Sequence, residues 1–143
     1  MPLPLSCELL NYTVDCLSVQ RLVSRPPLED VIRPDFKVED DHRCFRAMLV
    51  VRKTVDGVQF FAAIQGNFRF GEEISSANAI NAWENGCTIL YGVLRGLYTP
   101  LMAQCAGKVS CLPSVMMRNE VIRRINEKKP ANTVARDSDG VAK

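Results

Sequence analysis

The sequence contains very little histidine and no paired-cysteine motif, and these two shortages limit the chemistry open to the chain. Its 143 residues include one histidine, His42, and six cysteines, none of which forms a CxxC pair. A zinc site usually needs four ligands at tight spacings, so the cysteines are expected to be free thiols that pack as small apolar side chains. No GxSxG segment, glycine-rich phosphate loop or HExxH motif occurs either. We therefore expect no metal, no cofactor and no enzymatic activity.

Long apolar runs are also missing. No uncharged stretch approaches the ~18 residues that indicate a membrane-spanning helix. The first ten residues lack a basic segment and already contain Glu8, unlike a secretory signal. These features predict a cytoplasmic protein without membrane insertion, a compartment in which thiols stay reduced.

The charge is nearly balanced, with 18 basic and 16 acidic side chains and a net charge of +2. The excess comes from residues 128–143, so the body of the protein is neutral. A nucleic-acid-binding protein usually shows a strong basic stripe, and none is evident here. We predict one globular domain over residues 1–128, followed by a polar, aperiodic tail over residues 129–143 that should be disordered.

Alternation of apolar and polar residues predicts strands over residues 7–22, 43–55 and 58–70. Asp56 and Gly57 separate the last two, and this dipeptide is a strong signal for a two-residue hairpin because both positions need a positive φ. The sheet should therefore contain antiparallel neighbours.

Other positions in the strand region are less regular. Residues 24–34 contain three prolines and are predicted to be a connector, before a short strand at residues 36–38. The alternation slips at Cys16 and Leu17, which indicates a β-bulge. Gly66 indicates either a bulge or a close backbone approach.

Helical periodicity begins after the serine pair at 75–76, which is a candidate N-cap, and predicts a helix over residues 77–106. Pro100 should kink or fray this helix, and Gly107 should end it. A last helix is expected over residues 114–128. Apolar residues recur every three or four positions along the long helix and form a continuous seam: Trp83, Cys87, Leu90, Leu94, Leu97 and Leu101.

The order of elements predicts an α+β fold, in which a four-stranded antiparallel sheet carries a long helix across it and a shorter C-terminal helix. A sheet this small cannot cover a long helix with a continuous apolar seam on its own. We therefore expect the seam to form an interface between subunits of a homo-oligomer.

Three segments carry a family resemblance. Residues 65–70 read Gln-Gly-Asn-Phe-Arg-Phe, residues 89–95 read Ile-Leu-Tyr-Gly-Val-Leu-Arg, and residues 112–115 read Leu-Pro-Ser-Val. Their order and spacing resemble the SecB protein-export chaperone family. In that family a hairpin ends in a Gln-Gly-Gly-Ile-Phe type segment, a helix carries an Ile-Leu-Phe-Pro-Tyr-Ala-Arg type run, and a Leu-x-Pro-Val segment opens the last helix. Arg95 and Val115 keep the family spacing.

The resemblance, which covers residues 7–127, implies an ATP-independent holdase for unfolded or preprotein polypeptides, assembled as a tetramer from two dimers. An exposed surface of methionine and aromatic side chains can hold many unrelated apolar segments. The side chains expected to contact clients are Tyr12, Met48, Val50, Phe61, Tyr91, Tyr98 and Met102.

The chain departs from the family in ways that bear on its partners. Gly92 stands in place of a helix proline, and Met116 and Met117 replace an Asn-Phe pair. Family members are typically acidic, whereas this sequence has a pI of about 8.2 and its tail lacks an acidic, metal-associated segment. Cations gather in the last helix: Arg118, Arg123, Arg124, Lys128 and Lys129. We expect weak or absent binding to the SecA motor, and specialised clients such as an antitoxin or a mobile-element product.

Three other functions fit the same elements. A hotdog-like acyl-thioester hydrolase would need acidic groups near the long helix, for which Glu72, Glu73 and Glu84 are the candidates. A structural oligomer without chaperone activity is another alternative. An RNA-binding module is disfavoured by the neutral body.

Overall fold

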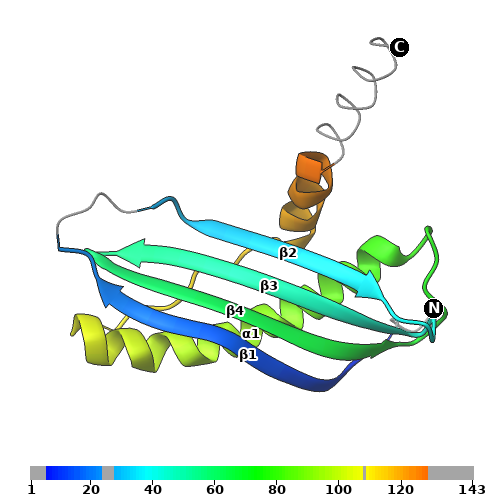
Figure 1. Cartoon of the computed structure of the whole chain (residues 1–143), viewed down its shortest axis with the longest axis horizontal. Coiled ribbons are helices and arrows are strands. Elements are labelled where there is room, and N and C mark those ends of the chain that lie inside the picture. The colour runs from blue at the N-terminus through cyan, green and yellow to red at the C-terminus, as the bar shows by residue number, and fades with distance from the viewer. Residues whose placement is uncertain (1–5, 24–27, 108, 129–143) are drawn as a thin grey trace, which may run out of the picture.

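The computed structural model describes residues 6–23, 28–107 and 109–128, so the predicted tail at residues 129–143 lies outside the described residues. One four-stranded sheet and two helices make up this part of the chain (Figure 1). The elements are β1 (Cys7–Arg21), β2 (Val31–Val38), β3 (Cys44–Val55), β4 (Val58–Phe70), α1 (Ala79–Ala106) and a C-terminal helix over residues 117–128. All three strand pairings are antiparallel, in the order β1-β4-β3-β2. The predicted α+β fold class is confirmed.

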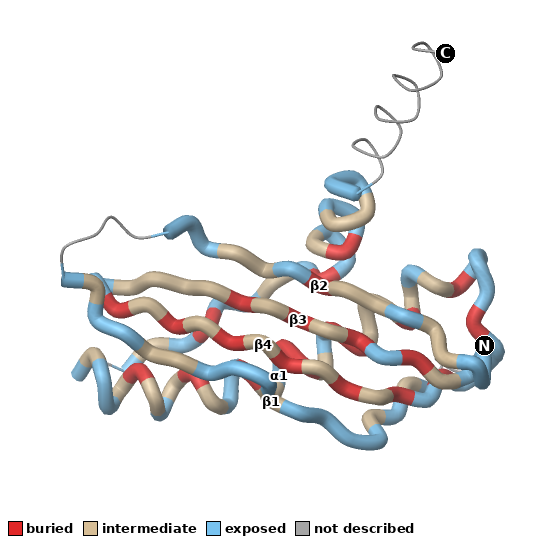
Figure 2. The backbone as a smooth tube through the Cα atoms, in the orientation of Figure 1, coloured by how far each residue is buried: buried red, intermediate tan, exposed pale blue. Residues whose placement is uncertain are grey.

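The helix α1 lies across one face of the sheet, which we call the covered face, and the described chain places no helix across the other (Figure 1). Apolar side chains of β3, β4 and α1 meet at the covered face and are almost fully buried. Buried positions are marked in red along β3 and β4 in Figure 2. The largest buried side chains are Tyr98, Phe45, Phe60, Phe68, Phe70, Leu49, Ile64, Leu90, Leu94 and Met102.

The hairpin between β3 and β4 follows the prediction. Asp56 and Gly57 have φ values of 52° and 76°, so both occupy the left-handed region that a two-residue turn demands. The pairing then runs without a shift from Val55 opposite Val58 to Cys44 opposite Arg69. This uninterrupted register fixes which side chains of the two central strands share a face.

The prediction of a connector up to residue 34 was wrong, because β2 spans Val31–Val38 and contains Pro34. A proline is tolerated in an edge strand, where a missing N–H need not interrupt a ladder on both sides. Pro34 and Phe36 turn toward the covered face opposite Leu49 and Ala47. The proline, which is rare inside strands, hides this alternation in the sequence.

Two local features of the sheet match the expected irregularities. The register of β1 against β4 shifts between Val14 and Cys16, directly before the predicted slip, and a further shift lies near Leu9. Gly66 is a position of close approach, since a Cβ there would lie 2.9 Å from Phe68 and 3.0 Å from Leu90. A glycine is therefore required where α1 crosses β4.

The helix boundaries differ from the predicted ones by two or three residues. Asn78, rather than the serine pair, occupies the N-cap position, and its side chain accepts a hydrogen bond from the Ser75 N–H at 2.8 Å. The helix continues through Pro100 to Ala106 instead of fraying. Gly96, whose carbonyl has no N–H of residue 100 to accept from, is exposed, so water can pair with that carbonyl. Gly107, at φ 71°, ends the helix as predicted. The C-terminal helix begins at residue 117, not 114.

Candidate functional site

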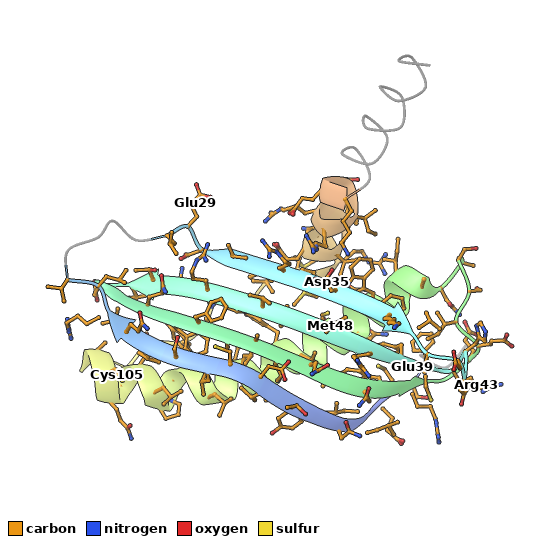
Figure 3. All side chains as sticks on the ribbon, in the orientation of Figure 1. Glu29, Asp35, Glu39, Arg43, Met48 and Cys105 are labelled. Carbon is orange, nitrogen blue, oxygen red and sulfur yellow. The ribbon has the colours of Figure 1, made fainter. Side chains whose placement is uncertain are left out.

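The face of the sheet opposite α1, which we call the open face, has partly exposed apolar side chains in its centre. Even-numbered residues of β3 and odd-numbered residues of β4 point to it, because their neighbours at odd and even positions are buried on the covered face. Met48, which Figure 3 labels in the middle of the sheet, belongs to this face. The apolar centre consists of Cys16, Met48, Val50, Phe61 and Ala63.

The strand register places these side chains in rows that cross the whole sheet. Val50 lies opposite Ala63, and Ala63 lies opposite Cys16, so the apolar centre is continuous from β3 to β1. In the next row Arg52 lies opposite Phe61. The side chains of Met48, Val50 and Phe61 are partly exposed.

Polar side chains hold the β1 side of the open face in place. Asn67 donates from its amide to the Asn11 carbonyl oxygen at 2.8 Å, and Gln65 donates to the Asp15 carboxylate at 3.2 Å. Such cross-strand pairs stabilise a sheet by roughly 0.2–1 kcal/mol each. They fix β1 against β4 beside the apolar centre.

The open face carries more cations than anions. The basic side chains on it are Arg33, Lys37, Arg46, Arg52 and Arg69, and the acidic ones are Glu8, Asp15, Asp35 and Glu39, the last of which pairs with Arg46. Asp35 is engaged by the C-terminal helix, because Arg124 donates to its two carboxylate oxygens at 3.1 and 3.3 Å and Lys128 donates at 2.8 Å. With Asp35 paired to that helix, the cations of the open face outnumber its remaining anions.

The C-terminal helix is fixed to the β2 edge of the sheet by a small apolar contact and these ion pairs. Met117 and Val121 are its buried side chains, and Arg118 forms an ion pair with Glu84 of α1 at 3.0 Å. The cations that the sequence gathers in this helix are therefore largely neutralised within the chain. Lys129 lies outside the described residues.

The structure places the predicted client-binding residues in three different environments. Met48, Val50 and Phe61 lie on the open face. Tyr12 is 48% exposed on β1, but it lies opposite Gly66 and so extends on the side of α1. The four side chains therefore do not form one patch.

The other three predicted client-binding residues are in the core, which is a correction to the sequence-based expectation. Tyr98 and Met102 have no exposed surface, and Tyr98 packs edge-on against Phe60 with ring centroids 4.9 Å apart. Tyr91 is 5% exposed and donates a hydrogen bond from its hydroxyl to the Pro113 carbonyl at 2.7 Å. Burial raises the pKa of this phenol above its ordinary value. These side chains offer no surface to a client in this conformation.

The seam predicted on α1 is likewise divided. Cys87, Leu90 and Leu94 are buried against the chain's own sheet, and burial raises the pKa of the Cys87 thiol well above its ordinary value. Trp83, Leu97 and Leu101 are partly buried at the rim of the same core. The buried row follows every fourth residue and runs through positions 82, 86, 90, 94, 98 and 102, because α1 packs by its i±4 ridge rather than by a heptad seam.

Glycines on α1 mark two different surfaces. A Cβ at Gly86 would lie 2.7 Å from the Phe45 ring, so close packing on the sheet requires that glycine. Gly92 and Gly96 are exposed and have open space where a Cβ would stand. Each costs roughly 1 kcal/mol of helix propensity relative to alanine. Nothing within the described chain explains them.

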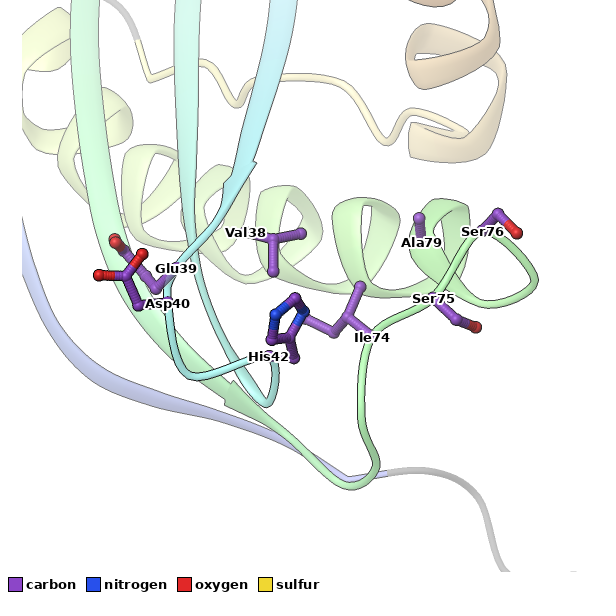
Figure 4. A pocket seen from close by; sticks show the side chains of 8 residues that line it. All are labelled: Val38, Glu39, Asp40, His42, Ile74, Ser75, Ser76 and Ala79. Carbon is purple, nitrogen blue, oxygen red and sulfur yellow. The ribbon is translucent and has the colours of Figure 1, made fainter.

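A cavity of about 550 Å³ lies at the end of the sheet near the start of α1 (Figure 4). His42 projects toward Ile74 in this cavity, while the carboxylates of Glu39 and Asp40 point away from the imidazole. The nearby Asp41 carboxyl accepts a hydrogen bond from the Arg43 backbone N–H, which lowers its pKa. Within the described residues no group of three potential metal ligands comes together.

The three glutamates that a hydrolase would need do not converge. Glu72 accepts a hydrogen bond from the Asn78 amide at 2.7 Å, and Glu84 is engaged by Arg118. Glu73 is exposed between β4 and α1. None of these three side chains lines the cavity beside His42.

Comparison with solved structures shows the same fold in a protein of very different sequence. The chain is similar to a SecB-like chaperone of Mycobacterium tuberculosis, solved in complex with a ChAD peptide from the HigA1 antitoxin. The two share 14% sequence identity with a TM-score of 0.52, over 76% of this chain and 87% of the other. No protein-family model matches the sequence, and no curated protein matches it. None of the helices in the described ranges combines the length and apolarity needed to cross a bilayer.

Proposed function

We propose that this protein is an ATP-independent chaperone that holds unfolded polypeptide segments on the open face of its sheet. The observation that carries the proposal is the apolar centre of that face, which no helix of the described chain covers. A solvent-exposed apolar patch bordered by polar and charged groups is typical of a protein-binding surface. The fold shared with a SecB-like chaperone supports the same function.

The composition of the open face suits many different clients. Met48 has a flexible, polarizable side chain that adapts to irregular partners, whereas Phe61 supplies a rigid apolar surface. The backbone groups of β3 and β4 are already paired in the sheet, so clients must be held through side chains. Such contacts discriminate little between apolar sequences.

The affinity for each segment should be modest. Burying an apolar side chain contributes at most ~1.5–3 kcal/mol, and association costs several kcal/mol of lost freedom. A single segment therefore binds reversibly, with a dissociation constant on the order of micromolar. Several copies of the open face in one assembly would raise the affinity for a long unfolded chain.

Assembly into a homo-oligomer, with a tetramer of two dimers as the expected form, follows from the surfaces that the single chain leaves uncovered. Gly92 and Gly96 lie on the outward side of α1, where a second helix can approach closely. Strand β1 is an edge strand of 15 residues, with one row of backbone groups directed away from β4. We propose that these two surfaces, together with Trp83, Leu97 and Leu101, form the contacts between subunits.

The clients that we propose are a small number of cytoplasmic polypeptides, such as an antitoxin, rather than exported proteins in general. The solved SecB-like neighbour was captured with an antitoxin peptide. The cations of the open face outnumber its anions, which disfavours a basic partner. We therefore propose that binding to the SecA motor is weak or absent.

The experiment that tests the proposal is a binding titration without ATP. Carboxymethylated α-lactalbumin, which stays unfolded in native buffer, is expected to bind, and its native disulfide-bonded form is not. Phe61→Asp should weaken binding at least tenfold. The control Val109→Asp introduces the same charge at an apolar residue that is 80% exposed after α1, and should leave binding unchanged.

Equal binding of folded and unfolded lactalbumin, or no binding of either, would exclude the chaperone proposal. In that case a structural oligomer is the remaining interpretation of the exposed surfaces. Light scattering on the same samples reports whether Phe61→Asp leaves the assembly intact.

A further inference from the structure

The charges that border the apolar centre of the open face follow a regular spacing along β3. Arg46, Met48, Val50 and Arg52 are successive residues of that face. Because alternate residues of a strand are about 6.6 Å apart, the two arginines stand roughly 20 Å from each other with two apolar side chains between them. The row thus reads basic, apolar, apolar, basic.

The two arginines retain hydrogen-bonding capacity. Arg46 is paired with Glu39 at 3.7 Å, but both side chains are more than one-third exposed, and such a pair contributes little. Arg52 donates through Nε to the Glu29 backbone carbonyl at 2.8 Å. A guanidinium has five N–H donors, so most of those on Arg52 remain for a ligand.

Neighbouring cations on β2 reinforce the row. Arg33 lies directly opposite Val50, and Lys37 lies opposite Arg46. Both are exposed, and neither has a hydrogen-bond or ion-pair partner within the described residues. Asp35, between them, is neutralised by the C-terminal helix. Apart from Glu39 beside Arg46, the remaining acids of the open face, Glu8 and Asp15, are on β1, at the other edge of the sheet.

Resting on the proposed function, we infer that the open face selects extended client segments in which acidic residues bracket two apolar ones. An extended chain has the same alternate-residue spacing as β3. A segment of the form acidic-x-apolar-x-apolar-x-acidic, laid along the strand, places its carboxylates against Arg46 and Arg52. Its apolar residues then meet Met48 and Val50.

A polypeptide fits this surface better than a nucleic acid does. Single-stranded nucleic acid is usually held by several aromatic rings on which bases stack, and the open face offers one, Phe61. The aliphatic side chains at its centre contact apolar side chains instead. The acids on β1 would repel phosphates there.

The test compares three labelled peptides by fluorescence anisotropy, with the intact protein at 150 mM salt. The first reads Glu-Ser-Leu-Ser-Leu-Ser-Glu, the second has lysine for glutamate, and the third, Leu-Ser-Glu-Ser-Glu-Ser-Leu, keeps the first composition in the wrong order. We expect the first to bind about tenfold more tightly than the other two, since each exposed ion pair contributes a factor of roughly two to five. The preference should shrink at 1 M salt.

Charge reversal locates the preference on the open face. Arg52→Glu should abolish the preference for the acidic peptide. The control Arg43→Glu makes the same change in the turn before β3, roughly 30 Å from Arg52 along the strand, and should preserve it; Figure 3 shows Arg43 at the end of the sheet. If Arg52→Glu does not fold, Arg33→Glu replaces it, because the Arg33 side chain has no hydrogen-bond or ion-pair partner within the described residues.

The outcomes separate this inference from the proposed function. If unfolded lactalbumin binds but the basic or reordered peptide binds as tightly as the acidic one, the selectivity is refuted and the chaperone proposal stands. If neither lactalbumin nor any peptide binds, the proposed function itself fails. Displacement of the acidic peptide by a thymidine oligonucleotide at equal concentration would also overturn the choice of a polypeptide ligand.

Discussion

The two faces of the sheet are built from the same strands, yet they have opposite environments. On β4, Phe60 has no exposed surface and contacts Tyr98 of α1, whereas its neighbour Phe61 lies on the open face among side chains that solvent reaches. Strand periodicity places the two rings on opposite faces of the sheet, but it does not say which face a helix covers. The difference arises because the helix that follows β4 crosses one face only.

This comparison separates stability from binding. The covered face supplies nearly all of the buried apolar core, so substitutions there should act on folding. The open face contributes little to the core, so substitutions there should act on ligands. Each prediction below tests that separation with a matched pair of positions.

The largest expected effect is on the adjacent phenylalanines. Phe60→Ala should lower the free energy of unfolding by about 3–5 kcal/mol, because it leaves a cavity between β4 and α1. Phe61→Ala should lower it by less than about 1 kcal/mol and should weaken client binding. Urea denaturation followed by circular dichroism measures both. Similar losses of stability would show that the open face is buried in the native assembly.

Glycines on opposite sides of α1 provide the second comparison. Gly86→Ala should destabilise the fold by about 1–3 kcal/mol, because the new methyl group would overlap the Phe45 ring. Gly92→Ala should raise helix stability by up to about 1 kcal/mol, while weakening subunit association. Thermal unfolding and light scattering distinguish the two responses. A Gly92→Ala protein of unchanged mass would argue against α1 as the subunit contact.

A third comparison concerns the β2 edge. Asp35→Asn removes the acceptor charge for Arg124 and Lys128, and should destabilise docking of the C-terminal helix by about 1–3 kcal/mol. Glu120→Gln, which weakens only an i,i+3 pair within the helix whose arginine, Arg123, is 65% exposed, should cost less than about 0.5 kcal/mol. Hydrogen exchange of residues 117–128 reports the docking. If the amides of residues 117–128 are equally protected from exchange in both variants, the apolar contact alone holds the C-terminal helix on the sheet.

The smallest effect concerns thiols on the two faces. Burial raises the pKa of Cys7 to about 11, so only about 0.3% of this thiol is ionised at pH 8.5. Cys16, exposed on the open face, should be alkylated at least tenfold faster at that pH, as measured by mass spectrometry.

The same pKa sets the pH dependence of stability. In the folded state the thiol of Cys7 stays neutral above the pKa of about 9 that it has when unfolded. Cys7 therefore has no effect on the pH dependence of stability below pH 9. As the pH rises from 9 to about 11, the unfolded state loses the thiol proton first and the free energy of unfolding falls. In Cys7→Ser, the free energy of unfolding measured by urea denaturation should fall less over this pH range.

Much of the fold could be predicted because its signals are local. The alternation on β1, β3 and β4 and the Asp56-Gly57 turn depend on neighbouring residues, and each prediction was confirmed. Most of strand β2 was missed because Pro34, which argues against a strand, lies in its middle. The position of β2 in the sheet is set by its pairing with β3, and local sequence patterns do not reveal such a pairing.

The candidate site was predictable only in part. Met48, Val50 and Phe61 could be placed on a second face by strand alternation. The sequence could not predict which side of α1 faces the sheet, because both the heptad seam and the i±4 row run through Leu90 and Leu94. Only packing on the sheet decides that Tyr98 and Met102 turn inward. The alternation of β3 also places Arg46 and Arg52 on the open face. Whether their guanidinium groups are available to a ligand depends on contacts with residues distant in sequence, such as Glu29.

The most direct test of the account asks which surface an unfolded chain touches. The three exposed thiols, Cys16, Cys105 and Cys111, can be labelled together with a benzophenone maleimide and irradiated with carboxymethylated α-lactalbumin in the absence of ATP. Cys16 is on the open face, whereas Cys105 is at the end of α1 and Cys111 is in the segment that follows it. The account predicts crosslinks predominantly from Cys16, and none with native lactalbumin. Crosslinks mainly from Cys105 or Cys111 would contradict it and would place the client on the helical side of the sheet.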